Sequence, residues 1–452
     1  MDAASNTADT RKGEHEILVA MEERMHKTTE RIESHFSMMH TRIQRFPRGL
    51  RGVAGDDDRY MAPSVVAIGP YHHGLPHLQE MEEVKHAAAH RFCEHARRST
   101  GEVYRRMLSL AGDARRCYSA ADAAVARLSD AELAAMMFLD GCFLLQYMSN
   151  GDAPLFAGCT LSSGPAILRD MMLLENQLPW LVLEALTGFM SVDVHGFVAD
   201  MGEKFFPKKN APRWMKCGGA AAAKRDAADE SSTSYGEYKP PHLLGLLRFS
   251  QIHSMPVAEL TYRAGSSSLL SSSAVELAQI GVKLAPSTAA WFADMGLRRK
   301  PVLGELSLSP LFLNDVTACW LVNMAALEAS TAASWDKDGF VVSSYLSVLA
   351  MLMDRKEDVH QLRTKGVLHS HFSNTQTLAF FKGLGRHLRL GGRYVVVLEQ
   401  IEAYKRNRPV QIAVHRFLYK NYKVIAAVLS IAGVLVGIFK ALLSLKTGRG
   451  AS

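Results

Sequence analysis

An uncharged apolar stretch near the C-terminus constrains this chain more than any other feature. Residues 424–439 read VIAAVLSIAGVLVGIF, and the apolar character continues beyond Lys440. As a helix, residues 424–445 would be about 33 Å long, enough to cross a hydrocarbon core of roughly 30 Å. We therefore predict a transmembrane helix over residues 422–446 and a short tail over 447–452.

A buried core helix could have the same composition, but two features favour the membrane. Gly433 and Gly437 are tolerated in membrane helices. Basic residues gather just before the span, at Lys405, Arg406, Arg408, Arg416, Lys420 and Lys423. Because a flank rich in lysine and arginine stays in the cytosol, we predict a single-pass membrane protein with a cytosolic N-terminal domain. The alternative is a plasma-membrane protein with an extracellular domain.

The rest of the chain agrees with a cytosolic location. The first twenty residues are polar, with no apolar core of signal-peptide length. The six cysteines stand far apart without a CxxC pair, which predicts reduced, mostly buried thiols rather than disulfides. No asparagine begins a glycosylation motif.

Helical periodicity predicts a mainly α fold: a disordered N-terminus at 1–13, then one large helical domain at 14–421. Ser-x-x-Glu capping spacing at Ser99 and Ser129 marks two helix starts. A minor β element is expected in GELSLSPLFL, residues 304–313, paired with 281–285. The other predicted helices cover 14–45, 79–98, 165–188 with a break at Pro179, 310–330, 343–365, 374–390 and 393–423.

Three segments have a distinct composition. Residues 208–241 and 264–274 are rich in small and polar residues, which predicts disordered insertions. Residues 14–45 carry an interrupted helical stripe of apolar residues, which would either self-associate as a coiled coil or dock on the domain.

Charge and motifs exclude several classes of function. The net charge is +7, and the basic residues are not interleaved with aromatic platforms, so no nucleic-acid partner is predicted. The basic stretch 405–423 reflects membrane topology or, as a lower-ranked alternative, contact with anionic lipid. There is no GxxxxGK[ST], GxGxxG, GxSxG or HExxH motif, and we predict no cofactor.

A histidine-rich turn is the densest polar motif. Gly69-Pro70 and Gly74-x-Pro76 enclose Tyr71, His72 and His73 in a rigid turn. Further along, His86 and His90 have an i, i+4 spacing that can chelate zinc. Since Ala87 replaces the expected glutamate and no third ligand is fixed, solvated histidines are the favoured interpretation over a metal site.

Two acids lie within very apolar sequence: Asp140 in MMFLDGCFLL and Glu175 in MMLLENQLPW. A buried carboxylate has a raised pKa unless it is paired, so either acid could act with His72 or His73 in a hydrolase. The favoured interpretation is structural, with Arg169, Arg248 or Lys85 as partners. Beside the break at Pro179, the amides Asn176 and Gln177 would satisfy exposed carbonyls.

These motifs resemble those of a known family. The run Ile68-Gly69-Pro70-Tyr71-His72-His73-Gly74, followed by Met81-Glu82 and Lys85, is similar to the N-terminal signature of the plant DUF247 family, also called UPF0481. The resemblance extends to Arg45-Phe46-Pro47 and to the blocks at 136–145, 169–186, 242–249, 274–284 and 343–368. Departures are GVAGDDDRYM after Arg51 and the block at 310–330, which keeps Asn314, Asp315 and Glu328 only.

The resemblance implies a membrane-associated plant protein without established enzymatic activity. Some grass members of that family are implicated in self-incompatibility between pollen and stigma. We therefore predict a non-enzymatic protein, anchored in a lipid bilayer, that acts through an unidentified protein partner in recognition or signalling. The alternative is a hydrolase that uses Asp140 or Glu175 with His72 and His73.

Overall fold

The computed structural model describes residues 17–30, 42–54, 58–119, 122–150, 163–207, 238–256, 272–288, 291–300, 303–331 and 340–448. Within these residues the fold is mainly α with little strand, as the periodicity predicts. The predictions for residues 1–13 and for most of the two insertions fall outside them. The ends of the insertions do not: Tyr238 stacks on Phe249, and Ser273 caps a helix that begins at Ala274.

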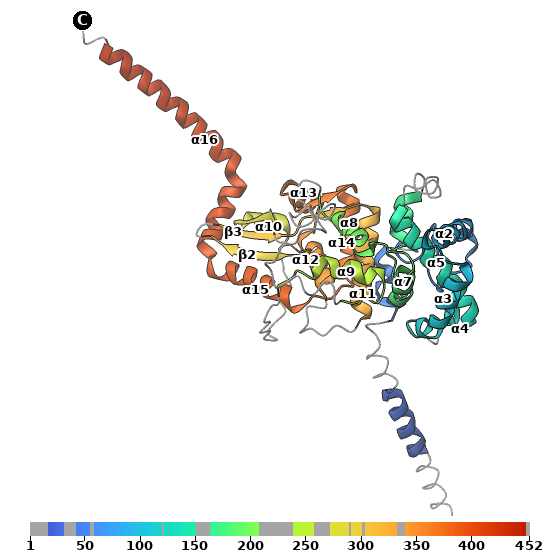
Figure 1. The fold of residues 1–452 in the computed structure, drawn as a ribbon. Helices are drawn as coiled ribbons and strands as arrows, with labels where there is room; N and C mark the ends of the chain where they lie inside the picture. The colour runs from blue at the N-terminus through green and yellow to red at the C-terminus, as the bar shows by residue number, and fades with distance from the viewer. Residues whose placement is uncertain are drawn as a thin grey trace, which may run out of the picture.

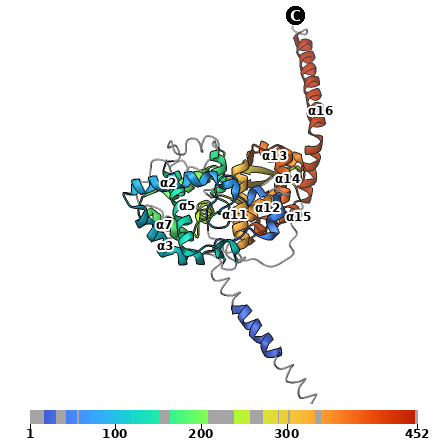
Figure 2. The same cartoon turned by 90° about the vertical axis from the view of Figure 1, so that its right-hand side faces the viewer.

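A helical bundle forms one end of the body (Figures 1 and 2). It contains α2 (Glu80–Ala96), α3 (Thr100–Arg116), the short α4 (Ala123–Ala126) and α5 (Asp130–Asn150). α5 packs against both α2 and α3. Because α5 is apolar on all sides, it has to be enclosed by other elements.

Two of these helices start where the Ser-x-x-Glu spacing predicts. The Ser99 Oγ accepts a hydrogen bond from the Glu102 amide at 3.2 Å. At α5 the bonds are reciprocal: the Glu132 amide donates to Ser129 Oγ at 3.3 Å, and Glu132 Oε2 accepts from the Ser129 amide at 2.8 Å. Each cap satisfies backbone donors that the first helical turn leaves open.

The other half of the body is built around α11 and α12. α12 packs against α14, and α14 contacts the 3₁₀ helix η1, so residues near both ends of the chain meet here. The elements not yet given are η1 (Arg48–Ala54), η2 (Asp58–Tyr60), η3 (Pro76–Leu78), α7 (Trp180–Thr187), α8 (Val194–Glu203), α9 (Leu243–Ile252), α10 (Ala274–Gln279), α11 (Asp315–Ser330), α12 (Val341–Leu352), α13 (Lys356–Thr364), α14 (Asn374–Gly385) and α15 (Gly392–Asn407).

The β structure is larger than predicted. β1 (Val282–Pro286) pairs in parallel with β3 (Gly304–Leu308), which confirms the predicted pairing of these two segments. β2 (Met295–Arg299) adds an antiparallel edge to β3. β4 (Leu311–Leu313) and β5 (Leu368–Ser370) form a separate parallel pair. β2 and β5 are short and lack alternation, so periodicity could not reveal them.

Three predicted helices are interrupted. The helix expected over 343–365 is divided into α12 and α13, because the buried Asp358 carboxylate accepts hydrogen bonds from the amides of Asp354 and Arg355 and starts a new helix there. The helix expected over 393–423 breaks at Arg408, because the following Pro409 disfavours helical backbone before it. The helix expected over 165–188 ends at residue 170, well before Pro179.

The N-terminal helix also differs from its prediction. Residues 17–30 are helical and exposed, so this part does not dock on the body. Residues 42–47 are not helical, and the helix therefore does not run to Pro47 as expected. Instead Ile43 and Phe46 are buried in the core, where the Ile43 amide donates to the Cys117 carbonyl at 2.7 Å.

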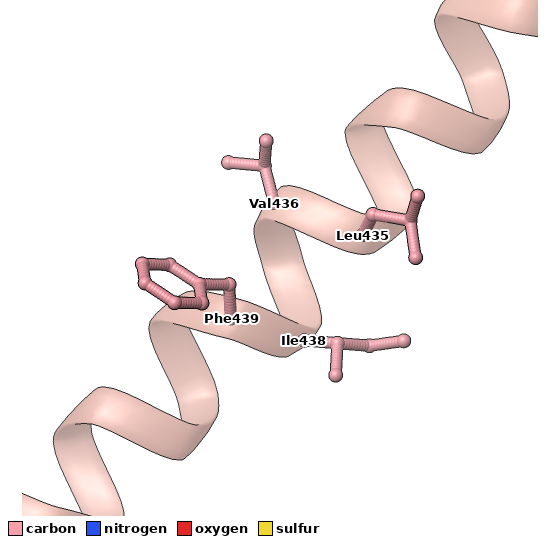
Figure 3. Close-up of a pocket in the computed structure, with 4 residues that line it drawn as sticks. All are labelled: Leu435, Val436, Ile438 and Phe439. Atoms are coloured by element: carbon pink, nitrogen blue, oxygen red, sulfur yellow. The ribbon is translucent and has the colours of Figure 1, made fainter.

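The last helix, α16 (Pro409–Gly448), projects away from the body (Figures 1 and 2). By length and composition, its residues 409–440 are a candidate membrane span, and none of the most apolar window is buried. α16 includes residues 447–448 of the predicted tail. A shallow hollow on it is lined by α16 side chains alone, shown in Figure 3: Leu435, Val436, Ile438 and Phe439.

The cysteines of the described chain agree with the predicted reduced state. Four of them are free thiols, and all but Cys117 are buried: Cys93, Cys117, Cys142 and Cys319. Burial raises the pKa of the Cys319 thiol to about 12, so this side chain is an inert core residue.

Candidate functional site

The segment between the helix at 163–170 and α7 carries the densest set of buried polar side chains. Residues 171–179 have no regular secondary structure, yet Met171 to Leu178 are all buried. Buried backbone groups outside helices and sheets need other partners. The side chains of Asn176 and Gln177 provide them.

Each of these two amides bridges several main-chain groups. Asn176 Oδ1 accepts from the Ile68 amide at 2.7 Å, and its Nδ2 donates to the Val66 and Asp170 carbonyls at 3.0 and 2.9 Å. Gln177 Nε2 donates to the Met171 and Leu173 carbonyls at 2.8 and 2.9 Å. Asn176 thereby ties residues 66–68 to the buried segment.

Glu175 joins the same segment to the N-terminal part of the chain. Its Oε2 accepts from Arg45 Nη1 at 2.6 Å, and its Oε1 accepts from the Phe46 amide at 2.7 Å. Arg45 also binds Asp122, with Nε 2.8 Å from Oδ2, and lies 3.8 Å from the ring centre of Tyr71. The partner of Glu175 is therefore Arg45, which sequence reasoning did not suggest.

The two histidines of the turn differ in environment. His72 Nε2 lies 4.0 Å from Glu175 Oε2, and burial lowers the pKa of His72, which favours the neutral ring. His73 is half-buried, and its backbone carbonyl accepts from Arg127 Nη2 at 2.8 Å. The backbone rather than the ring of His73 fixes the turn to the bundle.

Asp140 belongs to a second buried group. Its Oδ1 lies 2.7 Å from Lys85 Nζ, and its Oδ2 accepts from the Gly69 amide at 2.8 Å. Lys85 also donates to Glu82 at 2.6 Å. Burial alone would lower the pKa of Lys85, but the carboxylates of Asp140 and Glu82 outweigh it and raise that pKa. Lys85 thus stays protonated within the core, one turn after the buried Met81.

Gly69 shows why the turn has its sequence. Its φ of +79° is accessible to glycine without strain, and an added Cβ would lie 2.6 Å from the Gln177 carbonyl oxygen. The turn therefore presses its backbone against the segment 171–179. Pro70 and Tyr71 follow it, and Tyr71 Oη donates to the Ile43 carbonyl at 3.0 Å.

Two members of the network were missed by sequence reasoning. Asp170 is fully buried, and its Oδ2 accepts from the amides of Ser64, Val65 and Val66 at 2.9, 2.7 and 3.2 Å. Asn323 Oδ1 accepts from the Leu174 amide at 2.8 Å. The signal for Asn323 was present, since it is an amide within an entirely apolar helix.

The other suggested cations bind different acids. Arg169 Nη2 lies 2.9 Å from Asp170 Oδ1 rather than near Asp140 or Glu175. Arg248 Nε donates to Glu328 Oε1 at 2.8 Å. Glu328 is buried and also accepts from the amides of Val342 and Ser343 at 3.0 and 2.8 Å, at the start of α12.

Comparison with known proteins identifies this set of motifs. A model of the family DUF247, described as a plant protein of unknown function, matches residues 43–436. The chain belongs to the DUF247 family. It is also 26% identical over 359 residues to the UPF0481 protein At3g47200 of Arabidopsis thaliana, covering 72% of this chain and 68% of that protein. No solved structure matches.

The proposed metal ligands lie on the exposed side of α2 of this DUF247 member. His86 Nδ1 is 2.7 Å from the Glu82 carbonyl oxygen, and His90 Nε2 is 3.3 Å from Glu94. Among the described residues, no group of three or more histidine, cysteine, aspartate or glutamate side chains is placed to hold a metal ion. Both histidines are engaged within their own helix.

The geometry of the two acids determines what they can do chemically. Both oxygens of Asp140 and both of Glu175 accept hydrogen bonds or ion pairs from buried or half-buried groups. Asp140 and Glu175 lie in separate groups, and His72 is near Glu175 only. A general acid or base needs access to the proton it transfers. This arrangement instead fixes loop backbone to helices, as the buried positions of Asn176 and Gln177 also do.

Proposed function

We propose that this DUF247 member is a single-pass, tail-anchored membrane protein. Its helical body lies in the cytosol and acts by contact with another protein, in recognition or signalling, rather than by catalysis. The observation that carries the anchor is the exposure of α16, where large apolar side chains from Val424 to Phe439 have no covering element. An apolar surface of this size is unfavourable in water.

Orientation is proposed from the basic flank. Lys420 and Lys423 precede the uncharged stretch and are exposed. Lysine and arginine are retained on the cytosolic side of a span. The body, which precedes the span, is therefore placed in the cytosol rather than outside the cell.

Action by contact is supported by the site geometry. The polar side chains of the DUF247 motifs are used to hold residues 43–72 against the core, with their hydrogen-bonding capacity satisfied internally. This is the role expected of a rigid scaffold that presents a surface. Hydrolysis by Asp140 or Glu175 with His72 and His73 would require exposed functional groups.

Fractionation tests the anchor, and protease protection tests the orientation. Full-length protein expressed in plant cells should remain in the membrane pellet after alkaline carbonate extraction. In sealed microsomes, the body should be digested by added protease. Release by carbonate would refute the anchor, and protection of the body would favour the extracellular alternative.

Two further measurements test action by contact. Glu175→Gln should lower the thermal unfolding temperature, because it weakens the attachment of Arg45 and Phe46. An unchanged unfolding temperature together with the loss of a measurable hydrolytic activity would contradict the scaffold role. Proximity labelling with the anchored full-length chain, compared with a chain truncated at residue 423, would identify partners that depend on membrane attachment.

A further inference from the structure

The surface is hollowed where α10, α15 and α16 meet, beside the start of the projecting helix. The hollow has a volume of about 610 Å³. Its wall includes three cations and one carboxylate, together with two apolar side chains: Lys405, Arg416, Lys420, Glu276, Ile280 and Ile412. These residues come from segments more than 120 positions apart, so the hollow exists only in the folded chain.

Two contacts hold the base of α16 in this position. His415 Nδ1 is 3.1 Å from the carbonyl oxygen of Gln279 at the end of α10. Arg408, at the break between α15 and α16, donates to the Lys300 carbonyl at 3.0 Å. The first two turns of α16 are therefore part of the body, and the hollow is defined before the helix leaves it.

The charge inside the hollow is not balanced. Glu276 is engaged at the start of α10, where its Oε2 accepts from the Ser273 amide at 3.1 Å. Lys405 is paired with Glu402, with Nζ 2.7 Å from Oε1. Within the described chain, neither Arg416 nor Lys420 has a carboxylate partner. These two lie four positions apart on one face of α16, so their charges add.

The hollow is close to the proposed membrane surface. Lys420 precedes Val424 by about 6 Å of helix rise and Arg416 by about 12 Å. The headgroup layer on each side of a bilayer is roughly 5 to 8 Å thick. Phe417 and Tyr422, which are 62% and 61% exposed, lie at the same level, where aromatic residues gather at membrane surfaces.

We propose that this hollow binds the phosphate-bearing headgroup of an anionic phospholipid in the leaflet adjacent to the body. The inference rests on the proposed membrane anchor. The Arg416 guanidinium supplies paired N–H donors for phosphate oxygens, and Lys420 supplies a compact charge. Free phosphate has the same chemistry, but the apolar surface of α16 next to the hollow offers a place for acyl chains that only a lipid would use.

A binding measurement tests the proposal. The full-length chain is reconstituted in phosphatidylcholine nanodiscs and titrated with a fluorescent short-chain phosphatidylinositol 4-phosphate. The variant Arg416→Gln/Lys420→Gln should weaken binding about 25-fold, since each surface lysine or arginine contributes roughly fivefold. The matched control is Arg406→Gln/Lys423→Gln, which removes the same charge from residues outside the hollow and should change Kd less than twofold.

The competition arms separate the sources of phosphate. Unlabelled phosphatidylinositol 4-phosphate should displace the probe, whereas short-chain phosphatidylcholine should not. Displacement by inorganic phosphate at the same concentration as the lipid would overturn the lipid assignment. Equal loss of binding in the two double variants would also overturn the proposal, because it would indicate diffuse attraction to the membrane surface.

A second variant guards against misfolding of the first. Ser272 lines the hollow, and Ser272→Glu adds a negative charge there while leaving Arg416 and Lys420 in place. It should also weaken probe binding, and unchanged binding would contradict the proposal. Failure of the anchor is distinguished by carbonate extraction: a chain that stays in the pellet but shows no preference for anionic lipid refutes the headgroup site alone.

Discussion

α5 and α16 are both long enough and apolar enough to cross a membrane, yet they occupy opposite environments. Their most apolar windows have mean hydropathies of 1.2 and 2.2, and 72% of the first is buried against none of the second. Composition places both helices in one class. The neighbours of each helix, not its own sequence, decide whether its apolar surface is enclosed by protein.

The glycines of the two helices show how this difference arises. At Gly141 in α5, an added Cβ would lie 2.3 Å from Leu186 Cδ1 of α7, so the glycine permits close approach of two helices. At Gly433 and Gly437 in α16, no atom lies within 4 Å of the added position. α5 also carries Asp140, whose charge is balanced by Lys85 of α2. α5 is thus fitted to protein neighbours, and α16 has none along its apolar part.

Removing residues 424–448 should have the largest effect and would sharpen the comparison. The truncated chain should move from the carbonate-resistant pellet to the supernatant, although α5 is intact and has the length of a membrane span. Fractionation and immunoblotting measure this. Retention of the truncated chain in the pellet would show that α16 is not the anchor.

A lysine placed on each helix should separate them next. Leu144 is fully buried, so Leu144→Lys should destabilise the body by about 4 kcal/mol or more, because an unpaired charge enters the core. Leu435 is 61% exposed, and Leu435→Lys should leave the unfolding transition of the body unchanged. Circular dichroism of both variants in detergent tests this. Equal loss of stability would mean that α16 packs on the body.

The buried pair beneath the histidine turn should come third. Lys85→Met leaves the Asp140 carboxylate without its cation and should cost about 3 to 5 kcal/mol. The double variant Lys85→Met/Asp140→Leu should recover part of this loss, since no unpaired charge remains. Chemical denaturation provides the measurement. A single variant as stable as the original chain would remove this pair from the explanation of why α5 is enclosed.

The glycine pair gives the smallest expected difference. Gly141→Ala should destabilise by roughly 1 to 3 kcal/mol, as Leu186 must move to admit the methyl group. Gly437→Ala should be neutral for the body. Thermal unfolding of the two alanine variants under identical conditions compares them, and a neutral Gly141→Ala would show that α5 and α7 can separate without cost.

Local signals in the sequence predicted the elements that depend on neighbouring residues. The capping residues at Ser129 and Glu132 gave the start of α5, and its uniform apolarity gave its enclosure. The breaks at Met353 and Arg408 were missed, although Pro409 was a visible signal for the second. For the site, the sequence indicated Asp140, Glu175, Asn176 and Gln177 as unusual polar residues in apolar surroundings.

The sequence by itself determined the helical class, the apolar tail and the polar motif residues, because these follow from periodicity and composition over short spans. Only the tertiary structure decided the partners. Glu175 meets Arg45 across 130 positions, and Leu174 meets Asn323 across 149. Such pairs form because buried charges and backbone groups must be satisfied wherever the packed helices bring them together, and no local pattern records that distance.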